Sequence, residues 1–183
     1  MVIVVTMANK IDGKDCPKER QKLVLDIQQV FPVVPYPAGN IAWGDPNQSD
    51  EYRYANELFH KRHWNAISIE ELLAYPSGIS ATVTFLDDAA FLYYLPLFMQ
   101  VVVERFADCD LLSDSLLCEL TPNSEVVDAG FIMRFQGLTA EQKSCVTWFL
   151  QYLAECEVDG FSRVGAEAPP AVALGRYWRQ FAR

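Results

Sequence analysis

The chain has 183 residues and a formal net charge of −9 at pH 7, and 51% of its residues are hydrophobic while 21% are charged. This length and composition predict one packed domain over residues 1–183, which buries roughly 70% of the surface that its unfolded chain exposes. The acidic balance argues against nucleic acid and against an anionic membrane surface as partners, because both are bound through clustered Lys and Arg.

The N-terminal part is predicted to hold a flexible or peripheral segment, residues 1–14, and then a helix over residues 15–31. The apolar start, MVIVVTMANK, lacks the basic residues and the cleavage pattern of a signal peptide. Five cysteines without a C-x-x-C pair indicate neither a disulfide framework nor a zinc knuckle. We therefore expect a cytoplasmic protein with reduced thiols.

Two further helices are predicted before residue 80. The prolines of PVVPYP, residues 32–37, predict an extended connector, because proline cannot continue a helix. Ser49 then resembles the N-cap of a helix that ends in the basic stretch HKRH, residues 60–63. Ser68 and Glu71 have the spacing of a capping box, which predicts a short helix that ends before residues 76–78.

The longest apolar stretch, TFLDDAAFLYYLPLFMQVVVERF, predicts a central helix over residues 84–106. Thr84 and Asp87 have capping-box spacing at its start, and Pro96 predicts a kink near its middle. Its uncharged run, Ala89 to Val103, has 15 residues, whereas a membrane span needs about 20. The stretch is therefore predicted to be the buried core helix of a soluble domain.

The C-terminal part predicts three helices and one ambiguous segment. A short helix is expected over residues 113–120, and residues 125–135 fit either a strand or irregular chain. Thr139 and Gln142 form a predicted capping box at the start of the clearest helix, and a last helix follows at residues 168–183. The sum is a mostly α, single-domain helical bundle of six or seven helices with at most a small β element. We expect the helix from Thr84 and the helix near Ala140 to form its core pair.

Neither the histidines nor the catalytic motifs searched for give strong support for a metal site or an active site. Glu57, His60 and His63 read E-x-x-H-x-x-H, but steps of three residues drift around a helix axis and make poor geometry for one metal ion. This trio is a weak metal alternative to a charged helix end. The chain has no G-x-S-x-G, phosphate-binding glycine loop or H-E-x-x-H motif. We therefore expect no cofactor and no enzyme activity.

Two tyrosines next to Pro96 give an alternative hypothesis. The hydroxyl of Tyr93 or Tyr94 could bond a carbonyl that the proline frees, and the pair would then be structural. The kink could instead form a small pocket, and the protein would then be an enzyme or a binder of small molecules.

An acidic segment follows the apolar stretch. Between residues 104 and 128 the chain has seven acidic residues and one basic residue, Arg105. Such a segment either forms a solvated face or attracts a basic protein partner. The candidate partner-binding residues are Glu104, Asp108, Asp110, Asp114 and Glu119.

Three pieces of the sequence resemble a family of small uncharacterised bacterial proteins. They are ELFHKRHWNAIS from Glu57, FLYYLPLFM from Phe91 and RFQGLTAEQKSCVTWFLQYL from Arg134. The family has an aromatic-Leu-Pro helix followed by an R-F-x-x-L-T-x-x-Q helix start, and the resemblance covers roughly residues 41–153. It implies a bacterial origin and brings no catalytic residues with it.

In size and charge the chain is also similar to immunity proteins, which block a toxin by binding it. Our leading functional hypothesis is therefore a non-enzymatic immunity or antitoxin-like factor, whose partner is a cognate toxin with a basic surface.

Overall fold

The computed structural model describes residues 16–34, 49–75, 78–109, 111–156 and 167–183. Within these ranges the chain forms nine α-helices and no β-strand, which confirms a mostly α, single-domain fold. Asp110, residues 1–14 and residues 35–37 of the proline-rich connector lie outside the described residues.

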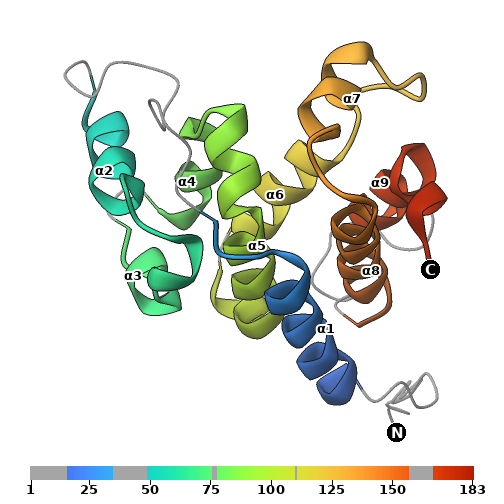
Figure 1. The fold of residues 1–183 in the computed structure, drawn as a ribbon, viewed down its shortest axis with the longest axis horizontal. Helices are drawn as coiled ribbons and strands as arrows, with labels where there is room; N and C mark the ends of the chain where they lie inside the picture. Colours follow the sequence, from blue (N-terminus) through green and yellow to red (C-terminus); the bar gives the residue numbers. More distant parts are fainter. Residues whose placement is uncertain (1–15, 35–48, 76–77, 110, 157–166) are drawn as a thin grey trace, which may run out of the picture.

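The other eight described helices lie around α5, which runs through the middle of the molecule (Figure 1). In Figure 1, α2, α3 and α4 lie on one side of α5, whereas α8 and α9 lie on the other side. The bounds are α1 Cys16–Val30, α2 Asp50–Phe59, α3 Ile69–Leu73, α4 Ile79–Phe85, α5 Asp88–Arg105, α6 Leu112–Leu120, α7 Ala129–Phe135, α8 Ala140–Cys156 and α9 Pro169–Arg176. Short 3-10 turns are η1 Trp64–Ala66, η2 Phe106–Asp108 and η5 Trp178–Phe181.

The central helix begins later than its sequence predicted. Thr84 belongs to α4, and the backbone is extended at Leu86 and Asp87, which separates α4 from α5. The Asp87 carboxylate accepts a hydrogen bond from the Ala90 backbone N–H at 2.8 Å and caps α5 by itself. The expected Thr84 capping box is therefore wrong, and the helix continues through Pro96 to Arg105.

Burial, rather than length, marks α5 as a core helix. Among the described residues, Asp88–Asp108 is the one segment long and apolar enough to cross a membrane, because its helical part extends past the uncharged run. However, 61% of its most apolar window is buried inside the fold. A core helix of a soluble protein has this property, and the bend expected at Pro96 stays a prediction.

The main partners of α8 are α1 and α9 rather than α5. Leu23 and Ile27 of α1 are fully buried, and this helix packs extensively against both α8 and α5. Direct contacts between α5 and α8 are few, whereas α8 also packs broadly against α9 and η5. The expected core pair is therefore wrong, because the apolar face of α1 occupies the space where the two helices would have met.

Two short helices account for the difference between the expected six or seven helices and the observed nine. One is α4, and the other is α7, within the segment that fitted either strand or irregular chain. The Asp128 carboxylate caps α7 by accepting from the Phe131 N–H at 2.9 Å. From α7, Arg134 forms ion pairs with Asp88 of α5, at 2.9 Å, and with Glu119 of α6.

Candidate ligand-binding cavity

The chain between α2 and α3 makes a tight turn that buries a tryptophan. Lys61 adopts a left-handed conformation with φ of 57°, which reverses the chain after α2. The guanidinium of Arg62 then donates to the carbonyl of Leu58 at 3.4 Å and to the carbonyl of Ala66 at 2.8 Å. These bonds hold η1 in place, and Trp64 at its start is only 4% exposed.

Two other elements bring side chains to the same place. Leu97 and Gln100 are three residues apart on α5, so they lie on one side of this helix just after Pro96. Gln28 comes from the last turns of α1, and Val33 follows where that helix has ended. The described packing of α5 against both α1 and η1 brings these groups together.

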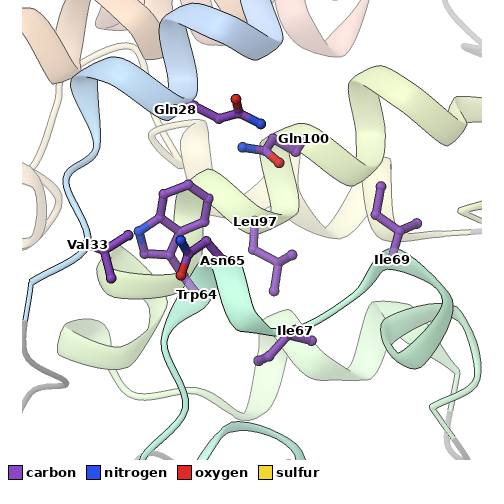
Figure 2. Close-up of a pocket in the computed structure, with 8 residues that line it drawn as sticks. All are labelled: Gln28, Val33, Trp64, Asn65, Ile67, Ile69, Leu97 and Gln100. Atoms are coloured by element: carbon purple, nitrogen blue, oxygen red, sulfur yellow. The ribbon is translucent and has the colours of Figure 1, made fainter.

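A cavity of about 370 Å³ lies between these elements (Figure 2). Its volume falls within the range of small-molecule sites, roughly 300–1,000 Å³. Figure 2 shows the Gln28 and Gln100 amides pointing towards each other from α1 and α5, with the Trp64 indole near them. The lining residues are Gln28, Val33, Trp64, Asn65, Ile67, Ile69, Leu97 and Gln100.

Two buried hydrogen-bond donors at this cavity lack an acceptor. The indole Nε1 of Trp64 and the amide Nε2 of Gln100 are buried without a hydrogen-bond partner in the described structure. A buried polar group left in this way costs about 1–3 kcal/mol. Indole nitrogen can only donate, and Figure 2 shows the Trp64 nitrogen turned towards Val33 and away from the two glutamine amides. Neighbouring atoms cover both nitrogens, so an acceptor in the cavity would reach them only after a side chain moves.

Among the described residues, the side chains that line the cavity are uncharged, and they are apolar apart from three amides. None of the eight lining side chains carries a formal charge, and five of them are aliphatic or aromatic. The remaining three, Gln28, Asn65 and Gln100, offer amide oxygens and amide N–H groups. Such a wall can bind by hydrogen bonds and apolar contact.

The two tyrosines beside Pro96 do not line the cavity, but they form hydrogen bonds with the segments next to it. The Tyr93 hydroxyl donates to the carbonyl of Val34 at 3.0 Å and lies 2.9 Å from Nδ1 of His63. Both partners are sequence neighbours of cavity residues, and burial raises the pKa of Tyr93. The buried Tyr94 hydroxyl donates to the carbonyls of Phe59 and Arg62 at 2.5 and 2.6 Å.

The acceptors of these hydroxyls differ from the predicted one. The sequence predicted a carbonyl within α5, freed by Pro96, whereas the observed acceptors belong to Val34, Phe59 and Arg62. The pair therefore links α5 to neighbouring segments. The cavity is lined on α5 by Leu97 and Gln100, which follow Pro96, and the two tyrosines of the alternative hypothesis do not line it.

The weak metal alternative gains no support from the described geometry. Glu57 forms an ion pair with Arg53 at 3.8 Å, His60 is the C-cap of α2, and His63 contacts Tyr93. In the described ranges, no three His, Cys, Asp or Glu side chains are grouped so that they could hold a metal ion.

The acidic candidates face different surroundings. Asp108 is 2.7 Å from the Arg105 guanidinium, and Glu119 is paired with Arg134. Glu104 is exposed beside a hollow next to α1, whereas Asp114 lines another hollow between α6 and α9. Asp110 lies outside the described residues. Two of the four described carboxylates are thus partly neutralised within the fold.

The cavity donors were missed because their setting depends on residues far apart in the chain. Trp64 lies 36 positions before Gln100, and α1 supplies Gln28 from still further away. One signal was present, since Gln100 is a lone amide within the uncharged apolar run Ala89 to Val103 of α5. Its significance depends on the neighbouring indole, which no local pattern predicts.

Comparisons with known proteins identify a family of unknown function. Neither the curated proteins nor the solved structures contain a match to this chain. The model of a family of unknown function, DUF6714, matches residues 19–182, which include the eight described residues that line the cavity. The chain therefore belongs to the DUF6714 family.

Proposed function

We propose that this protein is a non-enzymatic binding protein whose ligand occupies the cavity between α1, η1 and α5. The observation that carries the proposal is the pair of buried donors, Trp64 Nε1 and Gln100 Nε2, that line one cavity and lack an acceptor. Buried polar groups in proteins are nearly always hydrogen-bonded, so each exception calls for a partner. A molecule bound in the cavity would supply such a partner once the side chains that cover these atoms move aside.

The energies favour occupation by a ligand. Two unsatisfied donors cost about 2–6 kcal/mol together, since each costs about 1–3 kcal/mol. A ligand that restores both bonds gains this energy in addition to its apolar contacts with Leu97 and Ile67. Only part of the gain appears as affinity, because association costs translational and rotational freedom.

A fragment screen tests this proposal directly. Saturation-transfer NMR would compare the wild-type protein with the Gln100→Leu variant, and Gln29→Leu would serve as the control. Gln29 is an exposed residue of α1 beside Gln28 that does not line the cavity. We expect hits that Gln100→Leu loses and Gln29→Leu keeps. A set of hits that both variants retain would place binding elsewhere and reject the proposal.

A second candidate function uses the acidic segment. We propose, as this second candidate, that the protein is a cytoplasmic immunity or antitoxin-like factor that binds a toxin with a basic surface. The binding residues would be Glu104, Asp108, Asp110, Asp114 and Glu119. The supporting observation is that the side chains of Glu104 and Asp114 are exposed. Neither forms an ion pair with the described residues, so their charge can act on a partner.

The two candidates differ in their dependence on salt and charge. A pull-down from the native host, repeated with Asp108→Lys and Asp114→Lys, should lose a toxin-like partner, and the loss should resemble that caused by high salt. Glu57→Lys on α2 is a matched reversal away from the acidic segment. A partner that binds all three variants equally would exclude this second function.

A further inference from the structure

We infer that the surface between α6 and α9 binds an extended peptide segment of a partner protein, in which a basic and an acidic side chain lie about three to five residues apart. This surface, the α6–α9 groove, consists of two hollows of about 500 and 550 Å³ that meet at Val172 and Arg176. It shares no described lining residue with the Trp64 cavity. The inference therefore goes beyond the proposed binding function, and it shares only Asp114 with the second candidate.

Two hydrogen bonds hold the C-terminal ends of α6 and α9 together. The Arg176 guanidinium donates to the carbonyl of Pro122 at 2.7 Å, and the Trp178 indole donates to the carbonyl of Leu120 at 2.7 Å. Leu120 ends α6 and Arg176 ends α9. The first hollow runs back from this junction, because residues from the first turns of both helices also line it.

The far end of the first hollow is acidic. Asp114 lies in the first turn of α6 and Glu167 lies just before α9, and both side chains are exposed. Neither forms an ion pair with the described residues. Asp114 precedes Thr121 by seven residues, which is about 10 Å along a helix. A positive charge is therefore attracted to a point about 10 Å from the junction of the two helices.

The end beyond the junction has an excess of positive charge among the described residues. Arg176 and Arg179 line the second hollow together with Glu125, which offsets one of the two cations. Arg176 is half-buried, whereas Arg179 is exposed and forms no ion pair with the described residues. This end attracts an acidic side chain, with Arg179 as its contact.

Apolar side chains line the groove between its charged ends. Pro169 and Val172 are partly exposed there, and Val172 lies where the two hollows meet. An apolar side chain placed over Val172 loses contact with water, which supplies the non-directional part of the affinity. The exposed thiol of Cys118 lines the same hollow, so its reactivity reports whether the groove is covered.

A peptide is the class of ligand that carries both charges and an apolar group at this spacing. An extended chain advances about 3.3 Å per residue, so charges that are about 10 Å apart or somewhat more fall about three to five residues apart. Nucleic acid brings no cation for Asp114 and Glu167, whereas a polyamine brings no anion for Arg179. The two charges of a zwitterionic lipid headgroup are too close together to reach both ends.

Alkylation of Cys118 tests this inference. The probes are three pools of acetylated and amidated octapeptides, with two charged positions about three to five residues apart and Ala, Val, Leu or Phe elsewhere. One pool carries one Lys and one Asp in either order, the second carries two Lys, and the third carries two Asp. Peptide mass spectrometry would follow modification by iodoacetamide, with half-buried Cys16 outside the groove as the internal reference. We expect the mixed pool, at millimolar concentration, to slow modification of Cys118 severalfold and the other pools to slow it clearly less.

Charge reversal at either end should change which pool protects Cys118. Arg179→Glu makes both ends acidic, so the pool with two Lys should then protect best. Asp114→Lys should reduce protection by the mixed pool severalfold. Both positions are exposed, and urea unfolding would show that the variants remain folded.

Three control variants should leave the order of the pools unchanged. Lys22→Glu and Asp108→Lys reverse exposed charges outside the groove. Gln100→Leu alters the Trp64 cavity instead. Loss of protection in Asp108→Lys would move binding to the acidic segment of the second candidate and reject the groove.

The remaining outcomes also overturn the inference. Equal protection by all three pools would show that the charged ends do not select the ligand. Absence of protection by every pool would show that the groove does not bind such peptides. Slow modification of Cys118 before any peptide is added would show that another part of the chain, or a second copy, covers the groove. None of these results bears on the Trp64 cavity, whose fragment screen does not depend on Cys118.

Discussion

The hydroxyl of Tyr94 donates a hydrogen bond to the carbonyl oxygen of Phe59 at 2.5 Å, and this bond joins the middle of α5 to the last residue of α2. The two rings also pack with centroids 4.6 Å apart. Tyr94→Phe keeps the ring and leaves buried carbonyls without this donor, so we expect it to lower the free energy of unfolding by about 1–3 kcal/mol. Urea unfolding would measure the loss.

The neighbouring tyrosine is the control for this prediction. Tyr93→Phe removes a hydroxyl that is less buried, and water can replace it at Val34, so its effect should be under about 1 kcal/mol. Equal decreases in the free energy of unfolding for the two variants would show that burial of the Tyr94 hydrogen bond adds nothing to stability.

Two buried tryptophans should respond differently to the same substitution. The Trp178 indole donates to the carbonyl of Leu120 at 2.7 Å, whereas the Trp64 indole has no acceptor. Trp178→Phe breaks a buried bond, while Trp64→Phe removes an unsatisfied donor. We expect Trp64→Phe to be less destabilising by about 1–3 kcal/mol, measured by urea unfolding. The reverse order would mean that the Trp64 N–H is satisfied in solution without a ligand.

Arg134 should be a main tie between α5, α6 and α7. Its guanidinium pairs with Asp88 and Glu119 and lies 4.3 Å above the centre of the Phe91 ring. Arg134→Met should lower the free energy of unfolding by about 1–3 kcal/mol, an amount limited by the exposure of Asp88. Arg134→Lys keeps the positive charge but lacks the planar guanidinium that contacts both carboxylates. The decrease in its free energy of unfolding should therefore be smaller than that of Arg134→Met. Thermal and urea unfolding would check this order.

Glu71 should make stability depend on pH in the acid range. Its hydrogen bonds with Arg62 and with the Ser68 N–H lower the pKa of this carboxyl from 4.5 to about 2. The folded pKa lies below the unfolded one, so the contribution is complete above about pH 4.5 and is lost as pH falls towards 2. Glu71→Gln should make the midpoint of urea unfolding depend less on pH over this window. An unchanged pH dependence of the midpoint would contradict the role given to Glu71.

The five cysteines should react with alkylating reagents in order of exposure. Cys118 is exposed, whereas Cys109 and Cys145 are buried, and burial raises the pKa of both buried thiols. Because the thiolate is the reactive form, Cys118 should be modified first by iodoacetamide at pH 8 and Cys145 last. Peptide mass spectrometry would give the order. Early modification of Cys145 would show that α8 opens from α1.

Local chemistry explains what could be predicted from the sequence. The Ser68 and Glu71 side chains form both bonds of the predicted capping box, at 3.1 and 2.9 Å. Thr139 and Gln142 do the same at the start of α8, at 2.9 and 3.2 Å. Capping depends on residues within one turn, so sequence spacing is sufficient to find it.

The missed features depend on contacts between distant residues or on short segments. The start of α5 shifted because Leu86 and Asp87 are extended, although Thr84 has the spacing of a cap. The helix α7 has only seven residues, and its tie to α5 and α6 comes through Arg134. The cavity likewise needs three segments of the chain to meet at Trp64.

The contact between α1 and α8 has a kinetic consequence. Arg20 donates to the Tyr152 hydroxyl at 3.2 Å across a sequence separation of 132 residues. Closing so long a loop costs conformational entropy before the contact can stabilise the chain. We therefore expect α1 to dock late on the folding pathway. Substitutions of Leu23 and Ile27 should then speed unfolding and leave the refolding rate nearly unchanged. The half-life of the native state would thus depend on how long α1 stays docked.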